Sequence, residues 1–441
     1  MNQQTVPETT RLSFASAFLG FQHMLASFGG ILTAPLIIAL GMGLSIQETS
    51  YLVTSALVVS GLATFIQILR VGPIGSGLLS IQGTSFAFVG PFIYAYETMA
   101  QNLLPSEALG VLFGSAATCA AIVFVLSYFV RSLRTIITKN VSGTTLILIG
   151  ISLLVITLEN IRQEYQAMGT HGWQVGLIAA TVFVSVLVCS YSRLHILKIT
   201  SVAIGLMVGL IIALILGLVD WTLLENANAI FVLEPFRHSW RLDWTVVLLL
   251  FPIFLVSPTE SIGDFTATTA LSNYAYGDTA FWTRIRGGLM GDALNSFLAS
   301  VFCTFPNTTF SQNNGVIRLT GAYQPTIGLY AAGFLVLLGS IPVISALFQA
   351  IPSVAVYGAT LLLFIMVTVA GIQLVLSGGF DVRSALIVSL SVAGGYFLAE
   401  WSPQFKGLPQ ALQAVLGFPV STGAFLAVLL EVSLPLREQG K

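Results

Sequence analysis

Charged residues are scarce in this chain: only 8% of its 441 residues are Asp, Glu, Lys or Arg, against about 25% in a typical soluble domain. So few charges cannot cover a soluble globule, which excludes a soluble enzyme. The 17 basic and 18 acidic residues nearly cancel, so there is no basic face for nucleic acid. Cysteine is also rare. Cys119, Cys189 and Cys303 all lie in apolar runs, which predicts buried thiols and excludes a disulfide scaffold.

Long uncharged stretches make up most of the sequence, and 56% of the residues are hydrophobic. A bilayer span needs about 20 mostly apolar residues, so the stretches predict about 12 to 14 spans in a lipid bilayer, with no room for a soluble domain. The longest of them is expected to break near Pro352. The polar N-terminus lacks a basic region and a cleavage site, which predicts a retained first helix and not a signal peptide. The uncharged stretches are 12–47, 49–69, 108–130, 140–158, 165–192, 199–219, 293–317 and 319–380.

The basic residues are distributed unevenly between alternate loops. If the N-terminus is cytoplasmic, only Arg162, Arg237, Arg241 and Lys406 fall on the outer side. The positive-inside rule therefore predicts cytoplasmic N- and C-termini and an even number of spans. The predicted inner residues are Arg11, Arg70, Arg131, Arg134, Lys139, Arg193, Lys198, Arg284, Arg286, Arg318, Arg383, Arg437 and Lys441.

Two short polar segments interrupt the apolar pattern about half a chain apart. The first is GPIGSGLLSIQGTSFAFVGP (72–91) and the second is FPNTTFSQNNGVIRLTG (305–321). Each begins as extended chain and then becomes helical, with a start expected near Thr84 or Asn313. Interrupted segments at corresponding positions of two halves indicate a transporter site near the bilayer midplane. Seven spans in each half would make the second repeat inverted. The alternative is a pair of re-entrant loops or ordinary turns.

Three carboxylates fall in predicted spans, where a charge is expensive. Glu260 and Asp264 are four residues apart and share a helix face, and Asp292 lies near the start of the next span. Two carboxylates on one face repel when both are ionised, so holding a proton between them is favoured, as a proton-coupled carrier requires. His23 also lies in an apolar helix. For each of the four, a structural hydrogen bond is the alternative.

The other histidines, His171, His195 and His238, are predicted to be solvated in loops.

The segment QNNGVIRLTG resembles the signature of the nucleobase–ascorbate transporter family. Its fixed positions are occupied by Gln312, Asn313, Gly315, Thr320 and Gly321. Further similar motifs are the Gln22–His23 pair, GSGLLSIQGTSFAF, TESIGD, GDALNSF and FPNTTFSQNNG, in order along the whole chain. Among bacterial members the sequence looks most like xanthine and uric acid permeases.

The resemblance implies an all-α polytopic membrane protein with 14 transmembrane segments in 7+7 inverted repeats. The third and tenth segments would each contain a short strand followed by a half-helix, with the two strands paired. The core domain would comprise residues 1–130 (segments 1–4) and 243–350 (8–11). The gate domain would comprise residues 131–242 (5–7) and 351–441 (12–14). A homodimer formed through the gate domain is also implied.

The resemblance further implies that Glu260 and Gln312 bind the purine, with Phe88 and Phe310 as aromatic neighbours. This fits the chemistry, because Gln312 both donates and accepts hydrogen bonds while ionised Glu260 only accepts them. Planar rings suit a planar base, and half-helix N-termini would supply N–H donors to its carbonyl oxygens. However, the chain has 30 phenylalanines, most of which must serve packing. Ala87 stands where xanthine-selective members carry a larger polar residue, which leaves xanthine and uric acid both open.

The function expected from the sequence is proton symport of an oxidised purine, with the core moving against the gate. Asp264 and Asp292 would link protonation to core geometry, while Asn313 and His23 would brace the site. Gln312 at the first signature position, and Asp264 where uracil carriers have His, both favour purine over uracil. No cofactor or metal is expected, and a sodium ion stays open as the coupling ion.

The sequence leaves three alternatives to this function. One is a uracil or broad-specificity nucleobase symporter. Another is an anion channel or exchanger, which would want a basic residue at the interruptions, where the nearest is Arg318. An intramembrane enzyme is disfavoured, because the sequence contains no HExxH zinc motif and no GxGD motif.

Overall fold

The fold is taken from a computed structural model, which describes residues 13–129, 138–194, 197–198, 200–219, 231–275, 277–341, 343, 346–347, 350–379, 381–405 and 407–434. The first half contains α1 (Phe14–Gly41), α2 (Ile46–Leu69), β1 (Gln82–Thr84), η1 (Phe86–Phe88), α3 (Val89–Ala100), α4 (Pro105–Tyr128), α6 (Lys139–Ala167), η2 (Gly169–His171), α7 (Gly172–Ser190) and α9 (Ser201–Ile215). The second half contains α11 (Trp244–Leu271), α12 (Thr279–Val301), β2 (Asn307–Thr309), α13 (Gln312–Thr320), α14 (Pro325–Gly339), α16 (Ser353–Ser377), α17 (Val382–Trp401), η3 (Ser402–Gln404), α18 (Gln410–Leu416) and α19 (Pro419–Ser433).

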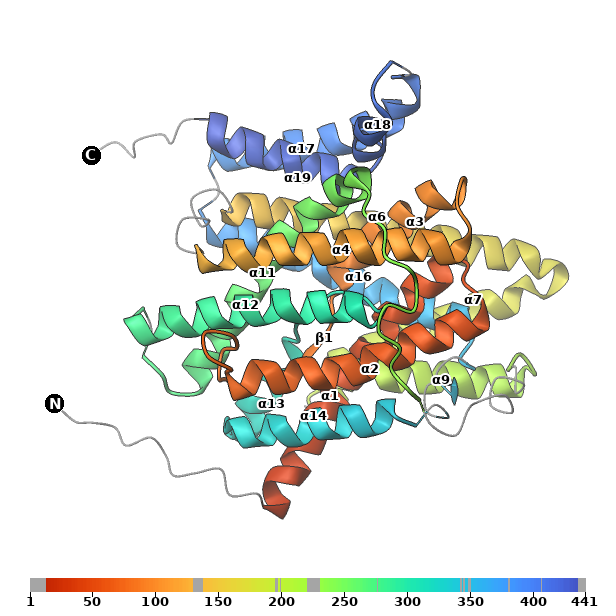
Figure 1. Cartoon of the computed structure of the whole chain (residues 1–441). Helices are drawn as coiled ribbons and strands as arrows, with labels where there is room; N and C mark the ends of the chain where they lie inside the picture. The colour runs from red at the N-terminus through yellow and green to blue at the C-terminus, as the bar shows by residue number, and fades with distance from the viewer. Residues whose placement is uncertain are drawn as a thin grey trace.

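These elements form two series of seven segments, counting each strand with the helix that follows it. The series are α1, α2, β1–α3, α4, α6, α7, α9 and α11, α12, β2–α13, α14, α16, α17, α19. Packing partners exchange between the two series: α1 packs on α14 as α11 packs on α4, and α2 packs on α14 as α12 packs on α4. The prediction of a helical membrane protein with 7+7 repeats is confirmed (Figure 1).

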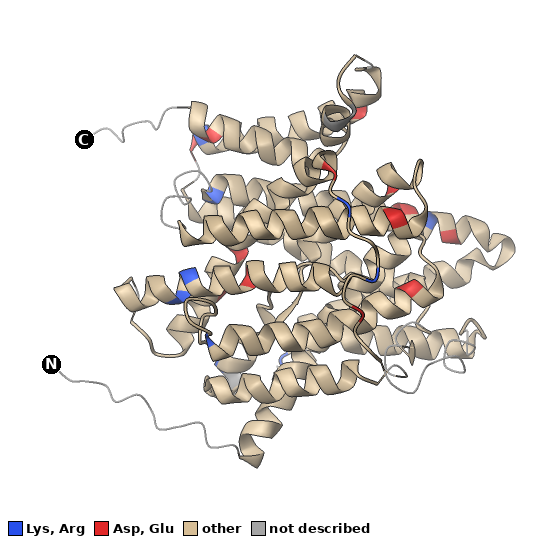
Figure 2. Cartoon of the chain, viewed as in Figure 1, with Lys and Arg blue, Asp and Glu red and all other residues tan. Residues whose placement is uncertain are grey.

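The lengths of the described helices suit a bilayer. Eight are long and apolar enough to cross a membrane, namely α1, α2, α4, α6, α7, α11, α16 and α17, and α9, α14 and α19 are shorter apolar helices. The break expected near Pro352 is confirmed, because Pro352 is the N-cap of α16. Figure 2 shows long helical stretches free of charge. The molecule is a multi-pass membrane protein.

Side-chain caps and small residues explain where several helices start and how they pack. Asp243 caps α11 by accepting from the N–H of Thr245 at 2.7 Å, and Asp278 caps α12 through the N–H of Phe281 at 2.6 Å. Where α6 crosses α16, a Cβ on Gly143 would lie 2.7 Å from the carbonyl oxygen of Gly371. Glycine at this crossing therefore lets the two backbones approach closely.

The ends of the helix bundle carry most described charges. Arg70 is the C-cap of α2, and Arg284 and Arg286 lie in the first turns of α12. Figure 1 shows these two helix ends together on the left, and the starts of α2 and α4 lie toward the right. At the right-hand end Arg237 pairs with Glu48 at 3.0 Å. Of the basic residues used for the orientation prediction, Arg11, Arg131, Arg134, Lys406, Arg437 and Lys441 lie outside the described residues, as does the N-terminal decapeptide.

Candidate functional site

Two short strands meet in the middle of the fold and bring its two halves together. β1 pairs with β2 in antiparallel fashion, with Gln82 opposite Thr309, Gly83 opposite Thr308 and Thr84 opposite Asn307. β1 packs on α1 and α2, and β2 packs on α11 and α12. The expectation of one strand in each polar segment is confirmed. The N-caps lie at Ser85 in the first segment, one residue after Thr84, and at Ser311 in the second, two residues before Asn313.

Asp264 joins helix α11 to the second strand. Its Oδ2 accepts a hydrogen bond from Thr309 Oγ1 at 2.9 Å, and its backbone oxygen accepts from Thr268 Oγ1 at 2.8 Å. Glu260 lies one turn earlier on the same helix, and the electrostatic influence of its charge reaches Asp264. The two carboxylates therefore share one helix face, as the sequence predicted.

Glu260 and Gln312 have free polar side chains. Glu260 is exposed although it lies well inside α11, and Gln312 is half-buried at the first position of α13. Neither side chain makes a hydrogen bond or an ion pair within the described residues. The two residues lie on helices that pack together, since Asn314 of α13 bonds to Thr268 and to the Asp264 carbonyl oxygen of α11.

Asp292 is buried, and it accepts a hydrogen bond from a residue that the sequence did not identify. Its Oδ1 accepts a hydrogen bond of 2.7 Å from Nε2 of Gln67, a fully buried residue of α2. Its carboxyl group also lies near Ser261 on α11 and Gln82 on β1. Sequence reasoning missed Gln67 because the contact spans 225 residues of chain. The one available signal was an amide late in an apolar span.

His23 and Asn313 meet between α1 and α13. Asn313 donates through Nδ2 to the carbonyl oxygen of Leu79 at 2.5 Å, just before β1. The imidazole of His23 is fully buried against the Asn313 side chain. Neither ring nitrogen has a partner at hydrogen-bonding geometry within the described chain. The predicted pair is therefore brought together, and Asn313 also holds the first polar segment.

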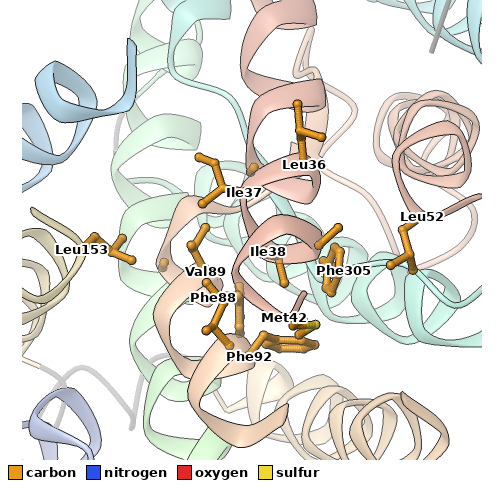
Figure 3. Packing of buried hydrophobic residues seen from close by; sticks show 14 of the residues in the cluster. Leu36, Ile37, Ile38, Met42, Leu52, Phe88, Val89, Phe92, Leu153 and Phe305 are labelled. Atoms are coloured by element: carbon orange, nitrogen blue, oxygen red, sulfur yellow. The ribbon is translucent and has the colours of Figure 1, made fainter. Parts of the chain in front are cut away.

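The aromatic candidates are packed within the protein. Phe88 is 1% exposed and lies 4.7 Å from the Phe254 ring centroid on α11. Figure 3 shows it beside Phe92, with Ile38 and Phe305 close by. Phe310 is 6% exposed. Ala87, next to Phe88, is also buried.

The expectation of free N–H donors at the half-helix starts is only partly met. The N–H of Asn313 donates to the Phe310 carbonyl at 3.1 Å, and that of Asn314 to the Ser311 carbonyl at 3.0 Å. In the first segment the N–H of Ala87 donates to Ser85 Oγ at 3.3 Å. These donors are therefore already used within the tight turns that start the helices.

Two predictions about residues outside the centre need correction. His238 is buried and not solvated: its Nε2 lies 3.2 Å from Glu48 Oε2, and its ring stacks on Phe113. Loop position alone did not reveal that the 231–243 segment folds back onto the core helices. Cys189 is half-buried, whereas Cys119 and Cys303 are buried as predicted. His171 is exposed, and His195 lies outside the described residues.

Sequence comparison connects this architecture to known carriers. A family model described as "Permease family" matches residues 14–403. The xanthine permease XanQ of Escherichia coli K12 is 35% identical over 437 residues, covering 96% of this chain and 92% of that protein. The xanthine permease XanP of the same organism is 33% identical over 429 residues, with the same coverage. A putative purine permease of Clostridium perfringens is 29% identical over 416 residues, covering 94% of this chain and 89% of that protein.

Solved structures share the fold at low sequence identity. The transmembrane domain of the cyanobacterial bicarbonate transporter BicA superposes with a TM-score of 0.60 at 13% identity, covering 96% of this chain and 99% of that one. The murine anion transporter Slc26a9 in its inward-facing state gives 0.62 at 12% identity, covering 96% and 69%. At this identity the likeness concerns the fold alone.

Proposed function

Because the chain belongs to the nucleobase–ascorbate transporter family of permeases, we propose that it imports an oxidised purine, xanthine or uric acid, by proton symport. One observation carries the proposal: Glu260 and Gln312, on the packed helices α11 and α13, offer a carboxylate and an amide that form no hydrogen bond or ion pair with the described residues. Polar groups that the fold does not use for its own hydrogen bonds can bind a ligand.

The chemistry of the two groups matches the polar edge of such a base. A xanthine-like ring presents N–H and C=O groups side by side, and an ionised carboxylate can only accept hydrogen bonds, here from the ring N–H groups. The amide of Gln312 supplies a donor and an acceptor to neighbouring groups. Phe88 and Phe310, with Ala87 between strand and helix, form the apolar surroundings, and the small Ala87 side chain supports a site that accepts more than one purine.

Proton coupling is assigned to Asp264 and Asp292. Both are tied to other elements, Asp264 to β2 through Thr309 and Asp292 to α2 through Gln67. Adding a proton to either carboxyl group removes a charge at these junctions, and so favours a different arrangement of the core. Asn313 and His23 brace the same centre from α13 and α1. The residues provide no group of three or more metal-ligating side chains in the described ranges.

Transport is proposed to proceed by movement of a core against a gate. The core comprises 1–130 and 243–350 and the gate 131–242 and 351–441, with the first boundary in residues outside the described ranges. The packing supports this division, because α1–α4 pack mainly with α11–α14 and α6–α9 pack mainly with α16–α19. We further propose a homodimer in the cytoplasmic (inner) membrane with both termini in the cytoplasm.

The test is uptake of radiolabelled xanthine by cells that express the chain. Glu260→Ala and Gln312→Ala should each abolish accumulation while the protein still reaches the membrane. Matched controls are Glu159→Ala and Gln163→Ala on α6, whose side chains, within the described residues, bond only to each other and to Arg162. Near-normal uptake by either site variant would refute the site. Competition by urate, guanine, hypoxanthine and uracil then defines the range of substrates and separates purine from uracil transport.

The coupling ion is tested with imposed gradients. An inward proton gradient should drive accumulation, and replacing sodium with choline should leave it unchanged. Uptake that ignores the proton gradient would indicate a facilitator or channel, and uptake lost in choline would indicate sodium symport.

A further inference from the structure

Both polar atoms of the Gln67 side chain form hydrogen bonds at one junction. Its Nε2 donates to Asp292 Oδ1 at 2.7 Å and to the Gly288 carbonyl at 3.0 Å, and its Oε1 accepts from the Ser76 N–H at 3.1 Å. A flipped amide would set oxygen against oxygen and N–H against N–H, so this orientation is fixed. Gln67 therefore connects α2, the turn that follows it, and the buried carboxylate of α12.

The turn after α2 lies directly on α12. The Gly75 N–H donates to the Gly287 carbonyl at 2.7 Å, and Arg284 Nη1 donates to the Ser76 carbonyl at 3.3 Å. Figure 1 shows this turn beside the first turns of α12. A Cβ on Gly291 would lie 2.3 Å from Gln67 Oε1. Glycine on α12 therefore makes room for the amide, and the turn is bonded to this helix.

The charged groups near Asp292 in the described part of the chain come from several elements. Asp264 on α11 reaches it electrostatically, and Ser261 and Gln82 are its uncharged neighbours from α11 and β1. The described charges of α2 and α4 are Glu48 and Glu107, in the first turns of those helices. On α12 itself Arg284 and Arg286 lie in the first turns, and β1 and β2 contain no charged residue. Gln67 is therefore a side-chain donor that bonds the Asp292 carboxylate directly, at 2.7 Å.

We propose that Gln67 is a positioning residue that stabilises the ionised form of Asp292 and links its protonation to the contact between the 71–77 turn and α12. This inference rests on the proposed function. When Asp292 is ionised, the Gln67 amide holds it and the turn together. When Asp292 takes up a proton, the charge-assisted bond becomes an ordinary one, which is weaker, and the turn is held less tightly on α12.

The test is the pH profile of xanthine uptake in Gln67→Met, which keeps the length and helix propensity of the side chain but removes both hydrogen-bonding groups. Without the donor, the neutral acid is favoured over the carboxylate. The midpoint of uptake against pH should therefore move to higher pH by about one unit, as expected for loss of a hydrogen bond to a charged group. Gln67→Glu, of the same shape, should reduce uptake more strongly because it places a second carboxylate against Asp292.

The control is Gln413→Leu, which loses two bonds to the carbonyl oxygens of Phe405 and Leu408, far along the chain from the carboxylates. It should keep the wild-type midpoint. A Gln67→Met profile with the wild-type midpoint, whatever its maximum, would overturn this inference. Absence of purine uptake by the wild-type protein would instead refute the proposed function. Binding of labelled xanthine to purified Gln67→Met protein, measured against pH, gives a second readout if turnover is too slow.

Discussion

Beyond β1 the chain makes one 3-10 turn at Phe86–Phe88 and a helix of 12 residues, whereas beyond β2 it enters a helix of nine residues directly. The side chains after β1 are mostly apolar and buried, with Phe88 and Phe92 packed against each other. Those after β2 are amides: Asn313 reaches Leu79, and Asn314 accepts from Thr268 at 2.6 Å. The segment after β1 contributes apolar packing, and the segment after β2 contributes hydrogen bonds.

The difference teaches how an inverted repeat becomes a site. The paired strands give both segments the same backbone frame, and the neighbouring helices occupy equivalent places. α1 and α11 both have 28 residues, and aligning their starts places Gly30 opposite Glu260. Glycine in the first half gives space, since a Cβ at Gly30 would lie 2.6 Å from Phe310 Cε1. The second half has the Glu260 carboxylate at the equivalent position. The polar groups are therefore concentrated in the second repeat, and the first repeat provides the space.

The largest expected effect comes from filling the space that β1 leaves for the second segment. A Cβ on Gly83 would lie 2.6 Å from both Phe310 Cε2 and Ile31 Cγ1. Gly83→Ala should therefore destabilise the protein by about 1–3 kcal/mol through overpacking. The measurement is the unfolding midpoint of detergent-purified protein. In a Phe310→Ala background the same substitution should cost less, because only the close contact with Ile31 remains; equal losses in both backgrounds would show that the Phe310 ring is not responsible.

The sequence predicted where the two polar segments lie but not the contacts that their residues make. Charge-free stretches predicted the spans, the two polar segments predicted extended chain followed by helix, and the four-residue spacing of Glu260 and Asp264 placed both on one face. Local patterns carry that information. The pairing of the two strands followed only from the family resemblance. The partners Thr309 and Gln67 could not be predicted in the same way, because each bond joins segments far apart in the chain. His238 was assigned to solvent because linear hydropathy does not show that its loop folds back onto Phe113.

A threonine in each strand gives a matched pair with a comparable effect. Thr309 Oγ1 donates to Asp264, whereas Thr84 Oγ1 is buried without a hydrogen-bond partner in the described part of the chain. Thr309→Val should lower the free energy of unfolding by about 1.5–3 kcal/mol, as for a hydrogen bond to a charged group, while Thr84→Val should be neutral or stabilising. Thermal unfolding of the two purified variants measures this. Similar losses of unfolding free energy at Thr309 and Thr84 would show that the bond to Asp264 does not distinguish the two strands.

The smallest effect is expected at the serines that precede the two helical parts. Ser85 Oγ accepts from the Ala87 N–H at 3.3 Å and so caps the first turn, while Ser311 makes no capping bond through its side chain. Ser85→Ala should cost about 0.5–1 kcal/mol, within the range for loss of a cap, and Ser311→Ala should leave the unfolding midpoint unchanged. Because Ser311 is exposed next to Gln312, its substitution should act instead on the KM for xanthine. A lower unfolding midpoint in Ser311→Ala would mean that the second segment also depends on a side-chain cap, and the contrast between the two segments would then be limited to the residues that follow.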